Sequence, residues 1–267
     1  MAGFRPGSHR LAVDIGNTET AIGVYAGSST ATDQVHLKTI RLPSDDHVTP
    51  DFLYSILLPH IEDLSFDAVV VSSVVPQLTA VWTELAECRM ESRTIVLEPA
   101  RIPGIEIRIA RPEEAGVDRI VNSWMGFRRY GGPLVIVDMG TATTFDVVDH
   151  DGAYLGGVIA PGVRLLAESL ARRTAKLPRI EIEPPATVVG RTTKEALQSG
   201  IVLGHTAMVE GLLNRIDKEL GTRRVVATGG LMNSVRPDLE SRFHAFDASL
   251  TLDGIIAISA EMGKGQG

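Results

Sequence analysis

The sequence predicts an α/β protein of two similar, duplicated domains with a cleft between them. Three observations lead to this prediction. A Val-Asp-x-Gly segment at residues 13–16 recurs at residues 137–140, so that Asp138 lies 124 residues after Asp14 (138 − 14). A second pair of similar segments follows in the same order, and strand-like and helix-like patterns alternate elsewhere. Strands that alternate with helices, twice over, favour two sheets covered by helices.

The bulk composition is that of an ordinary globular protein. The chain has 267 residues, and about 150 residues per domain gives roughly two domains. Hydrophobic residues make up 44% and charged residues 22%, a balance typical of soluble proteins. Cys88 is the only cysteine, so no disulfide can form within the chain, which favours a reducing cytoplasm.

Several classes of protein are disfavoured by the same numbers. The basic N-terminal segment is not followed by an apolar stretch, because Asp14 interrupts the first hydrophobic run, so we expect no signal peptide. No stretch approaches the roughly 18 to 20 apolar residues that span a membrane. The net charge is −7 without a basic block, which argues against nucleic acid as a partner. We expect a cytoplasmic protein that acts on a small molecule.

The repeat sets the expected domain boundary. "LAVDIGNTETAIGVYAG" (residues 11–27) aligns with "PLVIVDMGTATTFDVVDHDG" (133–152), and Thr20 then falls on Thr144. "VVVSSVVP" (69–76) similarly resembles "RVVATGGLM" (224–232). The segment between the two copies contains residues typical of a turn or loop, namely Gly131, Gly132 and Pro133. We therefore expect domains at residues 1–130 and 131–267.

The individual elements follow from hydrophobic spacing. Residues 67–75 form a continuous apolar run typical of a strand buried on both faces. Residues 76–88 have helical spacing, with Pro76 in the tolerated first turn, and residues 252–262 predict a C-terminal helix. The longest helical pattern, residues 194–221, contains three glycines, which indicate either close helix packing or a break into two helices. Its apolar seam is Leu197, Ile201, Gly204, Met208, Leu212, Ile216 and Leu220.

The two Asp-x-Gly segments are the chemistry-bearing features. The chain contains none of the P-loop, G-x-G-x-x-G, H-E-x-x-H or G-x-S-x-G motifs, and its seven histidines are scattered. A glycine turn after a strand lets backbone N–H groups approach phosphate. Polar side chains there could also donate to phosphate oxygens, and these are Asn17, Thr18, Thr20, Thr141, Thr143 and Thr144. Asp14 and Asp138 would act through a cation or water, although each segment alone could be a simple Asp-capped turn.

This pairing resembles the superfamily of actin, the sugar kinases and the heat-shock chaperone ATPases, whose fold is of the ribonuclease H-like, actin-like ATPase type. In that superfamily two phosphate loops face each other across an interdomain nucleotide cleft. "VVATGGL" is similar to the superfamily's adenosine loop, in which Gly229 and Gly230 would let the adenine lie against backbone.

A closer resemblance is to the type III pantothenate kinases. It is carried, in that family's order, by "DIGNT", "SSVVP", "RPEEAGVDRIVNSW", "VDMGTATTFDVV", "GGVIAPGV" and "AKLPRIE". The resemblance implies transfer of the γ-phosphoryl group of ATP to the 4′-hydroxyl of pantothenate, the first step of coenzyme A synthesis.

The resemblance also implies roles for residues 116–119. Gly116, Val117, Asp118 and Arg119 would bind pantothenate, with Asp118 as the base that accepts the hydroxyl proton. Such a base suits phosphoryl transfer, which otherwise needs mainly positioning and charge neutralisation. The guanidinium group of Arg119 would bind a carboxylate or phosphate oxygen. The alternative for Asp118 is a helix N-cap.

The remaining site residues are implied in the same way. Asp138 would hold a monovalent cation, K⁺ or NH₄⁺, near a dimer interface, and Mg²⁺ would accompany the nucleotide. Thr193 would complete the pantothenate site of the partner subunit, which implies a homodimer, although Thr193 could also be a helix N-cap. The residues implied to bind ATP are Asp14, Ile15, Gly16, Asn17, Thr18, Glu19, Thr20, Ala21 and Thr141, with Gly229 and Gly230 of the adenosine loop.

The sequence departs from the family pattern in three places, the last of them a pair of residues. Ile109 stands where the family usually has tyrosine, Glu19 stands where it often has asparagine, and Arg191-Thr192 replaces a lysine-asparagine pair. Two alternatives therefore remain beside a pantothenate kinase. One is a non-catalytic regulatory homologue that binds nucleotide or a pantothenate-like ligand. The other is a kinase for a different small alcohol.

Overall fold

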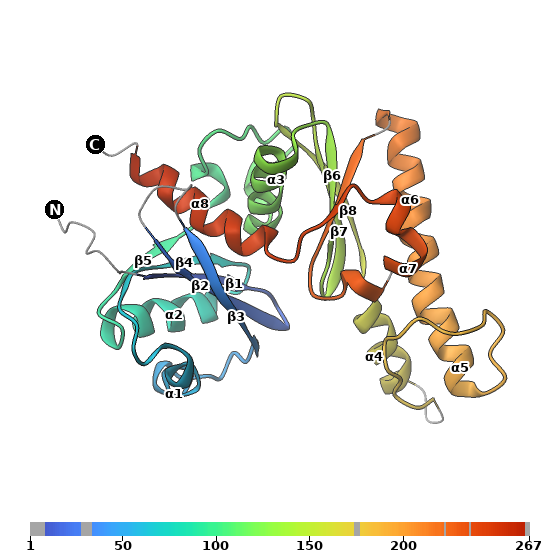
Figure 1. Cartoon of the computed structure of the whole chain (residues 1–267), viewed down its shortest axis with the longest axis horizontal. Helices are drawn as coiled ribbons and strands as arrows, with labels where there is room; N and C mark the ends of the chain where they lie inside the picture. Colours follow the sequence, from blue (N-terminus) through green and yellow to red (C-terminus); the bar gives the residue numbers. More distant parts are fainter. Residues whose placement is uncertain (1–8, 28–33, 174–176, 222, 235, 265–267) are drawn as a thin grey trace. The chain divides into compact units, whose positions relative to one another are not determined.

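The structure, a computed structural model, describes residues 9–27, 34–173, 177–221, 223–234 and 236–264 (Figure 1). It divides into two compact units. One unit contains the residues up to Met125 together with those from Ser249 onward, and the other is Gly126–Ala248. The first unit thus takes its final helix from the end of the chain.

The sheet of the first unit has five strands. In spatial order they are β3 (Val35–Pro43), β2 (Glu19–Ala26), β1 (His9–Ile15), β4 (Phe66–Ser73) and β5 (Arg93–Val96). Strands β1, β2 and β3 are antiparallel neighbours, whereas β4 runs parallel to both β1 and β5. The parallel position explains the continuous apolar run of β4, because both of its faces are covered.

The sheet of the second unit repeats this arrangement. Its strands, in spatial order, are β8 (Tyr154–Pro161), β7 (Ala142–Val148), β6 (Leu134–Met139), β9 (Arg224–Thr228) and β10 (Ala245–Phe246). Strands β6, β7 and β8 are antiparallel neighbours, and β6, β9 and β10 are parallel. Both order and direction match the first sheet, which confirms the predicted duplication.

Helices cover both faces of the first sheet. Helices α1 (Pro50–Ile61) and α2 (Pro76–Cys88) share a hydrophobic core with one face, which includes Leu11 and Val13. Helix α8 (Leu250–Lys264) contacts β1, β2 and β4. It packs on the other face of the sheet, to which the intervening residues of these strands point. A Cβ atom at Gly23 would lie 3.3 Å from Leu252, and Arg10 donates to Ser259 at 3.1 Å.

The second sheet is covered by α3 and α6. Helix α6 (Gly204–Leu220) packs Val209 and Leu213 against the β6, β7 and β9 side chains that include Val137. The C-terminal end of α3 (Val117–Tyr130) covers the opposite face, where a Cβ atom at Gly126 would lie 3.0 Å from Ile136. Three further helices belong to this unit: α4 (Val163–Arg173), α5 (Thr193–Gln198) and α7 (Arg236–Leu239).

The longest helical pattern is interrupted by a π-helical turn. Residues Ser199–Leu203 form this turn between α5 and α6. A π turn holds an extra residue and rotates the side chains that follow it. The predicted seam is therefore only partly correct for α6. Ile216 is buried and Met208 and Leu212 pack against the core, but the other buried side chains are His205, Thr206, Val209 and Leu213. Close packing is not the reason for the glycines, because a Cβ atom at Gly200 or Gly204 would meet nothing within 4 Å.

The division of the chain differs from the expected one in two respects. The boundary falls within α3, after Met125, a few residues before the glycine-proline segment at 131–133. The last helix belongs to the first unit, so the second unit ends at Ala248 and not at the end of the chain. None of the helices in the described ranges is both long and apolar enough to cross a membrane.

Candidate active site

The first phosphate loop is the three-residue turn between β1 and β2. Gly16, Asn17 and Thr18 form it, and Gly16 N donates to Glu19 O at 3.1 Å. The side chains of Asn17 and Thr18 are exposed. The turn therefore presents two polar side chains at the end of a buried strand.

Asp14 precedes this turn at the end of β1. Its carboxylate is half-buried and accepts a hydrogen bond from Ser72 Oγ at 3.1 Å. Ser72 lies on the neighbouring parallel strand β4, directly opposite Asp14. The small polar residue that breaks the apolar run "VVVSSVVP" thus orients the carboxylate, a contact that the sequence interpretation did not include.

Thr20 does not present its hydroxyl as predicted. Its side chain is buried, and Thr20 Oγ1 lies 2.9 Å from Ser44 Oγ. Ser44 N also donates to Thr18 O at 2.9 Å, so this serine holds the loop at two points. The prediction that Thr20 donates to phosphate is corrected, because its hydroxyl braces the loop from within the unit.

Glu19, which places a carboxylate beside the expected phosphates, has a cationic partner. Arg41 on strand β3 forms an ion pair with it, and both side chains are about 40% exposed (40% and 39%). Pairing with Arg41 reduces the repulsion that an isolated carboxylate would exert on phosphate. The departure at this position is thus compensated from the neighbouring strand.

The second phosphate loop is one residue shorter. Gly140 and Thr141 connect β6 to β7, and Gly140 N donates to Ala142 O at 3.0 Å. Asp14 consequently pairs with Ala21, whereas Asp138 pairs with Thr144. The sequence alignment of Thr20 with Thr144 is therefore not kept in the strand pairing.

Gly162 stabilises the second phosphate loop through a backbone hydrogen bond. Its N–H donates to Thr141 O at 3.1 Å, and a Cβ atom there would lie 2.3 Å from the same oxygen. No real side chain tolerates such a contact with backbone. This explains the glycine in the segment "GGVIAPGV".

Of the three threonines at residues 141–144, only Thr141 is exposed. Thr143 is fully buried, and its Oγ1 lies 2.9 Å from His205 Nε2. Thr144 Oγ1 donates to the buried Asp146 at 3.1 Å. The prediction that Thr143 and Thr144 donate to phosphate is thus corrected, since both hydroxyls already serve contacts inside the unit.

Asp138 and the adenosine loop meet directly. Gly229 has φ of +90°, and a Cβ atom there would lie 2.4 Å from Asp138 Oδ1. Glycine is required at position 229 for two reasons. Its φ angle is positive, and the Asp138 carboxylate lies where a side chain would begin. Leu231 N donates to Met139 O at 3.0 Å, which fixes the loop on the end of β6.

A cavity of about 500 Å³ lies beside the adenosine loop. Leu231 forms part of its wall, and α4 and residues 179–182 form the rest. Arg164, Arg172 and Arg179 line it together with Glu168 and Glu181. The arginines supply cationic groups to a cavity that reaches Leu231, the last residue of the adenosine loop.

Asp118 lies inside the first turn of α3 and is not its N-cap. The helix begins at Val117, and Ile120 N donates to Gly116 O at 3.2 Å. Asp118 Oδ1 accepts from Arg119 N at 2.9 Å. A Cβ atom at Gly116 would lie only 2.6 Å from this oxygen, so the glycine leaves room for the carboxylate.

The half-buried position of Asp118 makes its carboxylate more basic. Burial raises the pKa of Asp118 above the ordinary aspartate value, because the charged form loses solvation. The N–H of Arg119 and its positive charge act in the opposite direction and lower the pKa, but burial dominates. A carboxyl group perturbed in this way is typical of functional sites.

Thr193 is exposed at the start of α5. The N-cap is its neighbour Thr192, whose Oγ1 accepts from Glu195 N at 3.2 Å. The Glu195 side chain accepts from Thr192 N in return, which completes a capping box. The N-cap alternative for Thr193 is therefore wrong, and its side chain is left available to a ligand.

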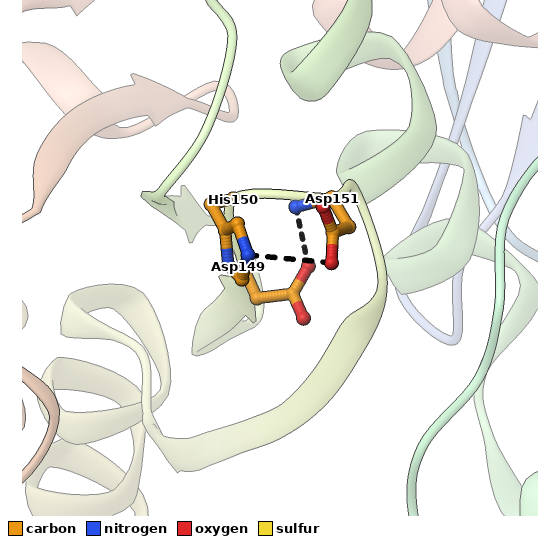
Figure 2. A group of neighbouring side chains, drawn as sticks. All are labelled: Asp149, His150 and Asp151. Carbon is orange, nitrogen blue, oxygen red and sulfur yellow. Dashed lines mark hydrogen bonds and ion pairs between the residues drawn. The ribbon is translucent and has the colours of Figure 1, made fainter.

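A second group of possible metal ligands lies elsewhere in the second unit. Figure 2 shows Asp149, His150 and Asp151, whose ligand atoms lie within 4.8 Å of one another. They occupy the turn after β7, at the opposite end of that strand from the phosphate loop. Asp149 Oδ1 accepts from the backbone N–H groups of Asp151 and Ala153, each at 2.9 Å, so it stabilises the turn.

Each unit thus holds its own part of the predicted residues. The first contains the loop at 14–21 and the segment at 116–119, and the second contains Asp138, Thr141, Thr193 and the adenosine loop. Residues 10–215 match the family described as "Type III pantothenate kinase". The chain belongs to the type III pantothenate kinase family. The match includes the segment that contains Asp118 and both Asp-x-Gly turns.

Curated relatives carry the same name. A type III pantothenate kinase from Thermomicrobium roseum is 39% identical over 262 residues, which cover 96% of this chain and 99% of that protein. One from Thermus thermophilus is 42% identical over 260 residues, with the same two coverages. These names fit a kinase and do not support the alternative of a non-catalytic regulator.

Solved structures confirm the fold. A protein from Campylobacter jejuni described as a Baf family transcriptional activator has a TM-score of 0.58 at 19% identity, covering 95% of this chain and 99% of its own. A ROK family glucokinase from Streptomyces griseus has a TM-score of 0.51 at 12% identity, covering 93% and 98%. At such identities the likeness shows the fold alone. It confirms two similar domains of the actin-like ATPase type.

Proposed function

We propose that this member of the type III pantothenate kinase family phosphorylates the 4′-hydroxyl of pantothenate with ATP, and that Asp118 is the catalytic base. The observation that carries the proposal is the half-buried Asp118 in the first turn of α3, with a raised pKa and with Gly116 leaving room for its carboxylate. A more basic carboxylate accepts a proton more readily in the transition state.

In the proposed reaction the hydroxyl oxygen of pantothenate attacks the γ-phosphorus of ATP. The bond between that phosphorus and the bridging oxygen breaks, ADP leaves, and the hydroxyl proton passes to Asp118. Gly116, Val117 and Arg119 bind the substrate beside it. The two phosphate loops contact the ATP phosphates through their backbone N–H groups and through Asn17, Thr18 and Thr141, while Asp14 acts through Mg²⁺ or water.

Asp138 is the proposed ligand of a monovalent cation. Its half-buried carboxylate lies against Gly229 and beside the second phosphate loop. Carboxylate and carbonyl oxygens suit a hard cation such as K⁺. A cation there would offset the repulsion between Asp138 and the phosphates.

A homodimer is part of the proposal. Among its described residues, the second unit exposes six large apolar side chains, namely Ile159, Leu165, Leu170, Val188, Val189 and Leu220. Val188 and Val189 are 74% and 80% exposed and lie shortly before Thr193 in the chain. Exposed apolar side chains in such number favour an interface with another chain. Thr193 of the partner subunit would then complete each pantothenate site, and the single cysteine is compatible with a cytoplasmic location.

The proposal is tested by measuring ADP release with MgATP and pantothenate, first in potassium buffer and then in sodium buffer, with mass spectrometry of the product. We expect pantothenate-dependent ADP release, a product heavier by one phosphoryl group, and loss of activity when sodium replaces potassium. ADP release that does not depend on pantothenate would rule out this substrate.

The departure at Ile109 bears on how pantothenate is bound. Ile109, in place of the family's usual tyrosine, is half-buried and offers no polar group to pantothenate. Other small alcohols should therefore be tested in the same assay. A kcat/KM at least tenfold higher with another alcohol would assign the enzyme to that alcohol.

A further inference from the structure

A small apolar pocket lies directly behind the first phosphate loop. It has a volume of about 240 Å³ and is formed by residues of the first unit alone. Its lining comes from the ends of β2 and β3, the connection that follows β3, and helices α1 and α2. None of the residues proposed to bind pantothenate contributes to it.

The walls of the pocket are apolar and well fixed. Leu53, Leu78 and Trp82 are at most 4% exposed and form its inner part, and Leu42, Val48 and Ile56 extend it outward. Phe52 also lines it and is 59% exposed. Apolar cavities of about 150 Å³ stay dry and bind benzene, so a pocket of this size has room for a substituted ring.

Three of its lining residues are polar and come from the start of β2 and from the segment that follows β3. Thr20, Ser44 and Asp45 contribute two hydroxyls and a carboxylate. Ser44 is hydrogen-bonded to Thr18 O and to the Thr20 hydroxyl, both at 2.9 Å. Two of the lining residues, Thr20 and Ser44, therefore also support the loop.

We infer that this pocket binds a compact apolar molecule carrying one hydroxyl or ammonium group, and that its occupant stabilises the first phosphate loop. The carboxylate and hydroxyls accept a hydrogen bond from the ligand's donor group, while the apolar part fills the space between α1 and α2. Occupancy limits the movement of Ser44, and the loop at residues 16–18 becomes more rigid in consequence. The pocket is thus a modulator site beside the nucleotide site.

The test uses 4-fluorobenzyl alcohol as the probe. Its binding is followed by ¹⁹F NMR line broadening, and the loop is followed by hydrogen–deuterium exchange of a peptide covering residues 14–21. We expect a Kd on the order of 0.1–1 mM for a ligand of this size, and slower exchange in the peptide when the probe is bound. Neither readout depends on kinase activity, so a failure of the proposed function leaves this test intact.

Two variants of α1 separate pocket binding from surface binding. Ile56→Trp fills the pocket and should weaken probe binding at least tenfold and abolish the effect on exchange. Leu58→Trp, on the same helix but outside the pocket, is the matched control and should behave as wild type. Thermal unfolding of both variants checks that they fold.

Three results would overturn the inference. The first is no binding to the wild type at several times the expected Kd, or equal binding to Ile56→Trp. The second is binding that leaves exchange of residues 14–21 unchanged, which removes the coupling to the loop. The third is displacement of the probe by pantothenate, which would make the pocket part of the substrate site.

Discussion

Two titratable side chains, the half-buried Asp118 and the buried His205, illustrate the same physical effect with different consequences. Burial raises the pKa of the Asp118 carboxyl group and thereby favours proton uptake. Burial lowers the pKa of the His205 imidazole to about 4 and keeps it neutral. A neutral imidazole can form a hydrogen bond with the Thr143 hydroxyl without placing a charge in the core. His205 is thus suited to positioning the strand that follows the second phosphate loop.

His205 also predicts how stability depends on pH. The pKa of His205 is about 4 in the folded protein and about 6.5 in the unfolded chain. Between these two pH values the unfolded chain is protonated at His205 whereas the folded protein is not. Stability should fall as the pH drops from about 6.5 to 4, by about 2 kcal/mol from this residue at pH 5. Urea unfolding of wild type and His205→Gln at pH 7.5 and 5 measures the difference.

The glutamine control keeps a hydrogen-bonding group near Thr143 but does not titrate in this range. The variant should therefore lose less stability than wild type between the two pH values. Equal losses in the two proteins would show that His205 is not the group responsible.

At the scale of single residues, the sequence identifies the motif positions better than the side chains that support them. Asp14, Asp138 and Gly229 can be recognised because each belongs to a short local pattern. Arg41 and Ser44 cannot, because the pairing of β2 with β3 brings them to the first loop. His205 cannot either, because it reaches Thr143 from helix α6, about 60 residues further along the chain. The hydroxyls of Thr20 and Thr143 were assigned wrongly for the same reason.

At the scale of elements, the two β-hairpins with their following parallel strands repeat, but their loops do not. The first loop has three residues and the second has two, so the pairing register differs by one residue. The π turn at Ser199–Leu203 likewise shifts the buried face of α6 partly away from the one that the helical pattern predicts. Such single-residue insertions leave hydrophobic patterns almost unchanged, and for this reason the sequence predicts the elements but not their exact faces.

Gly204 gives a test of this account of α6. It has helical φ and ψ angles of −61° and −42°, is exposed, and a Cβ atom added there would have no neighbour within 4 Å. Gly204→Ala should therefore raise the free energy of unfolding by about 0.5–1 kcal/mol, because alanine has the higher helix propensity. Urea unfolding checks the value.

Gly162→Ala is the contrasting variant. Its Cβ atom would lie 2.3 Å from Thr141 O, so this change should distort the second phosphate loop and weaken ATP binding at least tenfold. A destabilising effect of Gly204→Ala would instead show that a neighbouring surface packs against this glycine.

At the scale of the whole molecule, the proposed sharing of Thr193 between subunits has a specific consequence. In a mixed dimer of Asp118→Asn and Thr193→Ala chains, one site carries both changes and the other carries neither. Mixing two nearly inactive variants should therefore restore activity, up to half that of wild type in each mixed dimer. The measurement is pantothenate-dependent ADP release after the variants are unfolded together and refolded.

Each variant refolded alone is the control and should remain nearly inactive. If the co-refolded mixture is no more active than the two separate proteins, each chain builds its site without its partner's Thr193. Sedimentation of the same samples establishes whether a dimer is present.

The central claim, that Asp118 accepts the proton of the substrate hydroxyl, is tested most directly by comparing wild type with Asp118→Asn. The comparison measures kcat for pantothenate-dependent ADP release, together with MgATP and pantothenate binding by calorimetry. The account predicts that kcat falls by about 10²–10⁴-fold while both dissociation constants change little. It also predicts a thermal midpoint no lower than that of wild type, because the amide avoids the cost of a half-buried charge. A variant that keeps kcat within tenfold of wild type would contradict the role of Asp118 as the base.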